Sequence, residues 1–287
     1  MKKLLLHLDT DPMPSAFDQA VAYDSNVDNI IAYGDITPAN AASHVHGMIF
    51  TRSHKNLKNS AIFIGGSNVE ASEMVGEAVK KAFFSPVSVS VMLDPNGSNT
   101  TAAALVRKVL SQFDVTGKKV VIVGSGPVGQ RAALFLLKEG AGEVIITSRD
   151  IARAKAIASQ MEKNYGVIVT PEQANSDETV VALIKQADVA IAAGPAGVCI
   201  IPKIAWENND KLTIIADVNA LPPLGVEGIE IMDDGIEKKG IRFYGAIAIG
   251  NLKMKVHSAA IKSLYDSNDL FLDETTTYEI AHTIANQ

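Results

Sequence analysis

Short apolar runs alternate with amphipathic stretches along most of the chain. Apolar runs that predict buried strands lie at residues 3–9, 61–65, 87–93, 119–124, 143–148, 167–170, 188–193 and 213–217. Between them, apolar residues recur at helical spacing, as Val128, Ala132 and Leu136 do. Helices are predicted at 69–83, at 99–113, from the glycine-rich turn to 138, at 151–164 and at 251–265, and a terminal helix can form over 270–285. This alternation predicts an α/β fold in which right-handed crossovers build a parallel sheet.

A turn-rich segment at residues 94–101 separates two groups of elements. Its proline, asparagine and glycine favour a turn, and Ser98 or Asn99 can cap the helix that follows. Because 287 residues suit two domains, we place the junction on that helix. The prediction is a smaller N-terminal α/β domain over 1–98, which the C-terminal helix 267–287 joins, and a doubly wound, Rossmann-type parallel sheet over 99–266.

Composition excludes several classes of protein. Hydrophobic residues make up 47% of the chain and charged residues 20%, which suits a packed core and excludes a mainly disordered protein. The net charge of −6 and the lack of a basic stripe argue against a nucleic-acid partner. Every long apolar stretch is interrupted by charges or glycine before it could span a membrane, so no membrane partner is expected.

Cysteine and histidine usage adds little chemistry. The single cysteine, Cys199, excludes a disulfide scaffold and favours a reducing, cytoplasmic setting, and its apolar neighbours predict that it is buried. His44, His46 and His54 lie close together in the sequence, and the first two would share one face of a strand. No carboxylate or cysteine has metal-ligand spacing around them, so we predict no metal site.

The strongest motif is GSGPVG at residues 124–129, which follows an apolar strand and opens an amphipathic helix. In a dinucleotide site of this kind, Gly124 permits the tight turn, Gly126 lets the backbone approach a pyrophosphate, and Gly129 lets the helix lie against the strand. The helix N-terminus attracts the phosphates. The alternative is a glycine-rich turn without a ligand.

The end of the next strand indicates which nucleotide is bound. NAD-specific sites usually have an acidic residue there, whereas this chain has Ser148 and Arg149. Arg149 can form a charge-assisted fork with a 2′-phosphate, Ser148 can donate to it, and Arg153 lies one turn further on. Asp150 is expected to cap the following helix. NADP is therefore the predicted cofactor, with NAD as a second possibility and a solvated Arg149 as the structural alternative.

Two later strand ends complete the predicted cofactor site. Ala193 and Gly194 are small enough for a dinucleotide to lie against the backbone, and Asp217 or Asn219 could meet the nicotinamide carboxamide. Simple strand-terminal turns would explain these residues equally well. The residues predicted to bind the cofactor are Thr100, Thr101, Gly124, Ser125, Gly126, Pro127, Val128, Gly129, Ser148, Arg149, Arg153, Ala193, Gly194, Asp217 and Asn219.

Five segments together resemble one family. They are LDTDPMPSAFD at 8–18, LDPNGSNTTAAA at 93–104, GSGPVG at 124–129, ADVNALPPLGVEGI at 216–229 and GAIAIGNLKMKVH at 245–257. The chain resembles the NAD(P)-dependent methylene-tetrahydromethanopterin dehydrogenases of bacterial one-carbon metabolism. The resemblance implies two α/β domains with a cleft between them, a homo-oligomer, and hydride transfer from methylene-tetrahydromethanopterin to NAD(P), which gives the methenyl compound during formaldehyde oxidation in methylotrophy. Some members of the family also accept the tetrahydrofolate analogue.

The hydride step itself needs no general acid or base, because the cation formed is delocalised over two nitrogens. The site should therefore consist of positioning groups that hold the reactants close and exclude water. Asp18 or Asp94 can favour the cation, Phe17 can pack on the pterin, and the resemblance favours Lys255 as a pterin ligand or a desolvated, neutral amine. Core packing and solvated lysines are the structural alternatives. We predict Lys255 and Asp18 as catalytic residues, and as substrate-binding residues Phe17, Asp94, Asn96, Ser98, Asn99 and His257.

Two other functions stay open at this point. The first is a methylene-tetrahydrofolate dehydrogenase of the same architecture. It would lack cyclohydrolase activity, which in that family uses a Tyr-x-x-x-Lys pair in the first domain. Here the residue four positions after Tyr23 is Val27, and the residue four positions after Tyr33 is Thr37. The second is a non-catalytic NADP-binding or redox-sensing protein. Hydride transfer to the nicotinamide in the presence of a methylene carrier distinguishes the second from both dehydrogenases.

Overall fold

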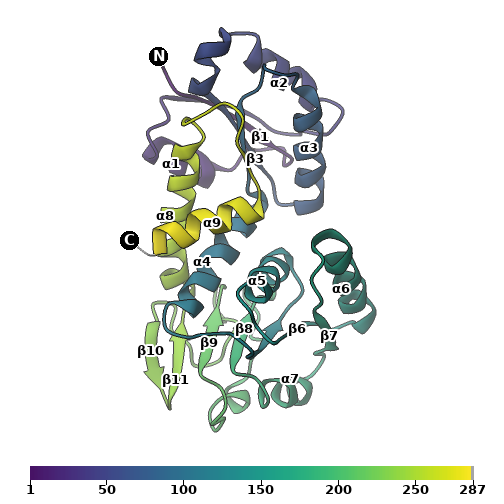
Figure 1. Cartoon of the computed structure of the whole chain (residues 1–287). Coiled ribbons are helices and arrows are strands. Elements are labelled where there is room, and N and C mark those ends of the chain that lie inside the picture. Colours follow the sequence, from purple (N-terminus) through teal and green to yellow (C-terminus); the bar gives the residue numbers. More distant parts are fainter. Residues whose placement is uncertain (286–287) are drawn as a thin grey trace. The chain divides into compact units, whose positions relative to one another are not determined.

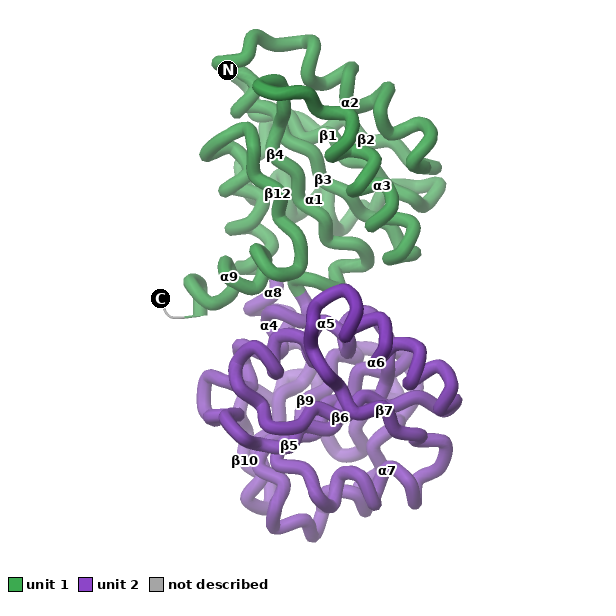
Figure 2. The backbone as a smooth tube through the Cα atoms, turned by 45° about the vertical axis from the view of Figure 1, so that its right-hand side comes forward, with its two compact units in different colours: residues 1–100, 254–287 green, residues 101–253 purple. Residues whose placement is uncertain are grey.

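The computed structural model describes residues 1–285 and divides into two compact units (Figure 2). Unit 1 consists of Met1–Thr100 together with Met254–Gln287, and unit 2 is the continuous segment Thr101–Lys253. Each unit is built around a largely parallel sheet, which confirms the predicted α/β class. The return to unit 1 comes before the predicted position at residue 266, because the second half of one long helix already packs on the first sheet.

The sheet of unit 1 has the order β12-β4-β3-β1-β2, and each adjacent pair is parallel. Its strands are β1 (Leu4–Asp9), β2 (Asn29–Tyr33), β3 (Ser60–Gly65), β4 (Ser90–Leu93) and β12 (Phe271–Leu272). Its helices are α1 (Ala16–Asp24), α2 (Ala41–Ile49), α3 (Val69–Ala82) and α9 (Glu274–Ala285), with 3₁₀ turns at His54–Asn59 and Pro95–Gly97. Two further helices, α4 (Ser98–Leu110) and α8 (Ala246–Ser263), cross the unit boundary.

Strand β1 is buried because both faces of the sheet are covered. Helices α2 and α3 cover one side of the sheet, and α1 with the end of α8 covers the other (Figure 1). Leu6 and Leu8 pack on the first side, whereas Leu5 packs on the second. On that second side the side chains of β1 become more polar along the strand, from Leu5 through His7 to Asp9. The polar groups thus gather at the carboxyl end of the sheet.

The sheet of unit 2 has the order β10-β11-β9-β8-β5-β6-β7, and β10 and β11 form an antiparallel pair. The chain runs from β5 outward to β7 on one side, then returns to β8 and β9 on the other, as in a doubly wound fold. The strands are β5 (Lys119–Val123), β6 (Glu143–Ser148), β7 (Thr170–Gln173), β8 (Val189–Ala192), β9 (Ile214–Asp217), β10 (Asp234–Lys238) and β11 (Ile241–Tyr244). The helices are α5 (Pro127–Lys138), α6 (Ile151–Tyr165) and α7 (Asp177–Ile184), with a 3₁₀ turn at Lys203–Ala205.

Several predicted elements are shifted. Strand β7 begins at Thr170 rather than 167, because pairing with β6 starts there and the left-handed Gly166 ends α6 just before. The predicted helix at 251–265 begins already at Ala246, and the C-terminal segment forms the short strand β12 before its helix.

The prediction for two histidines was wrong. His44 and His46 lie on helix α2, not on a strand, because the apolar residues Ala41, Val45 and Ile49 recur at helical spacing and are buried on one side. The His44 ring lies 4.3 Å from that of Tyr33, and Nε2 of His46 lies 3.2 Å from the carbonyl oxygen of Ala82.

Cys199 is exposed, which corrects the prediction that it is buried. It lies in the loop after β8, where Ile201 turns inward and Val198 and Cys199 turn outward. Within residues 1–285, no helix is long and apolar enough to cross a membrane. The same part of the chain contains no group of three or more His, Cys, Asp or Glu side chains that could hold a metal ion.

Candidate active site

In unit 2, the predicted cofactor residues gather at the carboxyl ends of adjacent strands. Asp217, Ala193, Gly124 and Ser148 lie at or directly after the ends of β9, β8, β5 and β6, which is also the order of these strands in the sheet. The chain reverses direction across the sheet at β5 and β8. Ligands of doubly wound sheets bind outside the strand ends at such a point.

The three glycines of the turn have different surroundings. Gly124 has a φ of +121°, and a Cβ there would lie 2.4 Å from the carbonyl oxygen of Ala193. A Cβ at Gly129 would lie 3.0 Å from the carbonyl oxygen of Gly124, so this glycine allows α5 to pack closely. A Cβ at Gly126 would meet nothing nearer than 3.8 Å, and Gly126 is the N-cap of α5 without a side-chain cap. The free space and free N–H groups at Gly126 fit a pyrophosphate.

Side chains around the turn hold its shape. The Gly124 backbone amide donates to Oγ1 of the buried Thr147 at 3.2 Å, and Nε2 of the Gln130 side chain donates to the Ser125 carbonyl at 2.9 Å. Pro127 is the first residue of α5, where a backbone N–H would have no acceptor within the helix, so proline loses no hydrogen bond there. Val128 follows it and is half-buried. These contacts tie the turn to β6 and to the start of α5.

The segment predicted to choose between NADP and NAD lies at the tip of β6. Arg149 and Arg153 are exposed, and the Gln173 side chain donates to the Arg149 carbonyl at 2.9 Å, so the backbone is anchored while the guanidinium stays accessible. The predicted cap is confirmed, because Oδ1 of Asp150 accepts from the Ala152 amide at 2.9 Å. Ser148 is half-buried, and its Oγ accepts from the Asp150 amide at 3.3 Å.

Asp217 and Asn219 are buried and engaged with the protein itself. Asp217 accepts from the Asn219 amide at 2.9 Å and from the Val226 amide at 3.1 Å. The Asn219 side chain donates to the carbonyl of Gly194 at 3.3 Å. Burial raises the pKa of Asp217, although these backbone donors oppose the rise. The two residues thus join the loops after β8 and β9, and contact with a nicotinamide stays a prediction.

In unit 1, Asp94 organises the predicted polar cluster at the start of α4. Its Oδ1 accepts from the amides of Asn99 and Thr100 at 2.9 and 3.2 Å, and its Oδ2 accepts from the Thr100 hydroxyl at 2.6 Å. The prediction that Ser98 or Asn99 caps this helix was therefore wrong, because a carboxylate is the stronger acceptor and the turn over 95–97 brings it to the helix end.

The neighbouring side chains of this cluster are also engaged with the backbone. The Ser98 hydroxyl donates to the Pro95 carbonyl at 2.7 Å, and the Asn99 side chain donates to the Leu93 carbonyl at 2.6 Å. Ser98, Asn99 and Thr100 are all buried, whereas Thr101 is half-buried and Asn96, with a φ of +52°, is exposed. Asn96 is thus the accessible member of the cluster, and ligand contacts of the others stay predictions.

Phe17 and Asp18 lie in the first turn of α1. The Phe17 side chain is 49% exposed, and its ring centroid lies 6.4 Å from that of His257. Burial raises the pKa of Asp18, while the nearby His257 and a hydrogen bond with Ser15 act in the opposite direction. The charge of Asp94 also acts to raise the pKa of Asp18.

The two candidate residues on the second half of α8 differ in burial. His257 is fully buried, and its ring stacks on Phe63 with 5.6 Å between the centroids. Lys255 is exposed. Its contact with a pterin carbonyl or nitrogen and its desolvation in a ligand complex both stay predictions.

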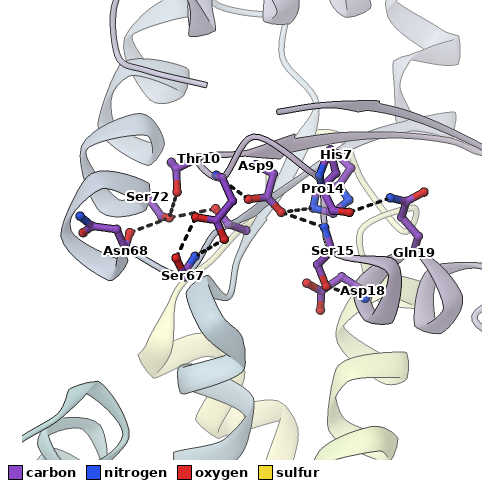
Figure 3. Close-up of polar contacts among 12 residues, drawn as sticks. His7, Asp9, Thr10, Pro14, Ser15, Asp18, Gln19, Ser67, Asn68 and Ser72 are labelled. Carbon is purple, nitrogen blue, oxygen red and sulfur yellow. Dashed lines mark hydrogen bonds and ion pairs between the residues drawn. The ribbon is translucent and has the colours of Figure 1, made fainter. Parts of the chain in front are cut away.

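The sequence favours a turn or capping role for Asp9 at the end of its strand, and the hydrogen bonds that Asp9 accepts from the Asp11 and Ser15 amides confirm it. His7 and Ser15 were missed, and they lie with Asp9 beside Asp18 (Figure 3). One signal was available, because Ser15 and Asp18 form the pattern Ser-x-x-Asp that marks the start of a helix. In the structure Ser15 caps α1 and accepts from the Asp18 amide at 3.2 Å. No comparable pattern distinguishes His7 within its apolar strand.

Comparison with protein families gives two matches along the chain. A family model described as methylene-tetrahydromethanopterin dehydrogenase, N-terminal, matches residues 16–96. A second model, described as shikimate / quinate 5-dehydrogenase, matches residues 104–223, which lie within unit 2.

Two relatives from Methylorubrum extorquens are similar over the full length. The chain is 45% identical to the bifunctional protein MdtA over 287 residues, which is 99% of each chain. It is 34% identical to the NAD(P)-dependent methylenetetrahydromethanopterin dehydrogenase over 298 residues, which covers 99% of this chain and 100% of the relative.

Among solved structures, shikimate 5-dehydrogenase from Listeria monocytogenes, in complex with shikimate and NAD, matches with a TM-score of 0.55. It is 13% identical, and the match covers 97% of this chain and 96% of that one. A shikimate dehydrogenase in complex with NADP+ gives a TM-score of 0.51 at 13% identity, covering 98% and 95%. Likeness at this level of identity concerns the fold.

Proposed function

Since the chain belongs to the family of NAD(P)-dependent methylenetetrahydromethanopterin dehydrogenases, we propose that it transfers a hydride from methylene-tetrahydromethanopterin to NADP, or also to NAD. The product is methenyl-tetrahydromethanopterin. The observation that carries this proposal is the identity of 34% over the full length of a relative named for that reaction. The segments on which the resemblance was recognised in the sequence lie in both units.

The two units divide the binding task in this proposal. In unit 2 the turn at Gly124–Gly129 would hold the pyrophosphate, Arg149 with Ser148 the adenosine 2′-phosphate, and the loops after β8 and β9 the nicotinamide half. The space at Gly126 and the exposure of Arg149 fit this assignment. In unit 1 the groups around Phe17 and Asp18 would hold the pterin.

When bound, the nicotinamide supplies the hydride-accepting carbon. The residues of this chain position the pterin and favour the cation that forms on it. The exposed Phe17 face would pack on the flat ring, and the Asp18 carboxylate would stabilise the developing positive charge from a partly desolvated place. No residue needs to exchange a proton with the reacting carbon.

Arg149→Ala tests the choice of nucleotide. We expect KM for NADP to rise about 10- to 100-fold, since a hydrogen-bonded charge is worth about 1.5–3 kcal/mol, while KM for NAD stays the same. Arg153→Ala is the matched control, because Arg153 is also exposed and lies one turn away, and its effect should be smaller. Equal NADP kinetics in the Arg149 variant and the wild type would contradict the assignment.

Lys255→Ala tests the role that resemblance gives to this lysine. If its ammonium binds a pterin carbonyl or nitrogen, KM for the pterin should rise about tenfold, with less change in KM for NADP. Lys262→Ala is the control, because Lys262 is also exposed on α8. Unchanged turnover and pterin affinity in the Lys255 variant would remove it from the site.

The substrate assignment is tested by steady-state kinetics with methylene-tetrahydromethanopterin and methylene-tetrahydrofolate, each combined with NADP and with NAD. The proposal expects the highest kcat/KM for the methanopterin carrier with NADP. Preference for the folate carrier would favour the second candidate, a methylene-tetrahydrofolate dehydrogenase of the same architecture. Absence of hydride transfer with both carriers would refute the proposal.

We also propose a cytoplasmic location and assembly into a homo-oligomer. The location rests on the single cysteine and the reducing setting that it favours. The assembly rests on the resemblance to the family. Sedimentation of the purified protein measures the number of subunits.

A further inference from the structure

Strand β1 of unit 1 carries a buried histidine–aspartate pair on the side of the sheet that faces α1 and α8. His7 and Asp9 are each 1% exposed, and Nε2 of His7 lies 3.3 Å from Oδ2 of Asp9. The His7 ring packs edge-on against Phe63, with 5.1 Å between the centroids. The mechanism proposed above uses neither residue, although burying two ionisable groups is expensive.

The neighbouring strand leaves room for the pair. Gly65 is paired with Asp9 in the sheet, and a Cβ at Gly65 would lie 3.2 Å from Nε2 of His7 and 3.3 Å from Oδ2 of Asp9. Both contacts are tighter than a methyl group normally makes, so a larger residue would press on both members of the pair. The glycine is thus suited to the pair rather than to a turn, since its backbone continues β3.

Asp9 fixes the loop that leads to α1. Its Oδ1 accepts from the Asp11 amide at 2.9 Å, and its Oδ2 accepts from the Ser15 amide at 3.0 Å (Figure 3). Burial alone would raise the pKa of Asp9, but the contact with His7 and the two amides together outweigh it and lower the pKa. The carboxylate therefore stays charged, which strengthens both hydrogen bonds.

The far side of the same loop is anchored to the N-terminal end of α3. Asp11 accepts from the Ser67 amide at 2.9 Å and from the Ser67 hydroxyl at 2.8 Å. The Thr10 and Ser72 hydroxyls lie 3.1 Å apart, which is hydrogen-bonding distance. The segment from Thr10 to Ser15 is therefore held along its length, with Asp9 as its inner anchor.

The anchored loop ends at the residues proposed to bind the pterin. Ser15, whose amide Asp9 holds, is the N-cap of α1 and accepts from the Asp18 amide at 3.2 Å. Phe17 and Asp18 follow within the same turn. A displacement of Ser15 would move both side chains together, and a misplacement of about 1 Å can cost about 100-fold in rate.

We infer that His7 and Asp9 are positioning residues that hold Phe17 and Asp18 in place for the pterin, acting through Ser15, whose amide donates to Asp9 and whose hydroxyl accepts from the Asp18 amide. The inference rests on the proposed function. His7 acts by its contact with Asp9, and neither residue is required to touch the substrate.

Asp9→Asn tests the inner anchor. Asparagine keeps the shape of the side chain but replaces one acceptor oxygen with an NH₂ donor, which cannot accept from the Asp11 or Ser15 amide. We expect KM for the pterin to rise about tenfold or more, while KM and Kd for NADP change less than about twofold. A loss of folded protein would lower apparent kcat but not change KM, so this split separates positioning from stability.

Asp28→Asn is the matched control. Asp28 accepts from the Lys3 amide at 2.7 Å, near the opposite end of β1, and is exposed. It loses the same kind of hydrogen bond, and its KM for the pterin should equal that of the wild type.

A second pair of variants tests the route through Ser15 without disturbing the buried pair. Ser15→Ala removes the cap of α1 and should raise KM for the pterin, whereas Ser15→Thr keeps a capping hydroxyl and should restore it. If Asp9→Asn does not fold, this pair decides the question.

Wild-type KM for the pterin in a folded Asp9→Asn protein, or in Ser15→Ala, would overturn the inference while the wild-type enzyme remains active. Failure of the proposed function looks different, because the wild-type enzyme itself would then show no hydride transfer from the pterin.

Discussion

Replacing Gly126 by alanine is expected to weaken NADP binding about tenfold or more, a cost of at least about 1.4 kcal/mol, without changing the melting temperature. The added Cβ would lie 3.8 Å from its nearest neighbour, so the protein has room for it. A bound pyrophosphate would collide with the added Cβ, because the backbone of such a turn approaches the pyrophosphate at its second glycine. Fluorescence titration with NADP and thermal unfolding measure the two effects.

Gly124→Ala is the matched comparison two residues away. Its Cβ would lie 2.4 Å from the Ala193 carbonyl oxygen, and the φ of +121° is strained for any residue with a side chain. The strain alone costs about 1–3 kcal/mol, and the overlap adds to it, so the melting temperature should fall. Unchanged NADP affinity in Gly126→Ala would refute the assigned role of the turn, and a destabilised Gly126→Ala would show that the turn is structural.

Asp18→Asn is expected to lower kcat with the pterin about 100-fold, because the neutral amide removes a charge aimed at the developing cation. NADP binding should not change, since it is assigned to unit 2. Stability should stay the same or increase: burial raises the pKa of Asp18, so holding it ionised at neutral pH costs folding free energy, which asparagine removes.

The pH dependence of the wild type follows from the same shift. The Asp18 carboxylate is present above its raised pKa and is lost as the pH falls through that pKa. kcat with the pterin should therefore decline on the acid side at a pH above the usual range of an aspartate, and the decline should disappear in Asp18→Asn. A pH profile that is identical in both proteins would exclude Asp18 from the chemical step.

The sequence predicted unit 2 more completely than unit 1. Strands such as Lys119–Val123 are continuous apolar runs buried on both faces, and the glycine turn follows directly. In unit 1, β2 (Asn29–Tyr33) is mostly exposed, and α1 has little separation of apolar and polar faces, so periodicity did not reveal them. The antiparallel pair β10 and β11 was missed as well, because β10 is a largely exposed edge strand.

Some residues of the candidate site could be predicted from the sequence, and others depend on contacts that only the fold creates. Gly126 and Arg149 could be named from the sequence because the role proposed for each concerns a ligand, and the structure leaves space at Gly126 and exposes Arg149. The role of Asp94 as the cap of α4 depends on a 3₁₀ turn that brings its carboxylate back to the start of the helix. The residue types in this segment do not reveal the path of that turn. The pairing of His7 with Asp9 depends equally on the space beside Gly65, on another strand.

The pairing of β12 with β4 has a consequence for synthesis. The Ser90 hydroxyl also donates to the Ser267 carbonyl, so unit 1 is completed by a segment that is synthesised after the whole of unit 2. Thr101–Lys253 is continuous and can fold as soon as it emerges. Unit 2 can thus fold before unit 1 is complete, and a premature stop shortly before β12 spares unit 2 while leaving unit 1 without its edge strand.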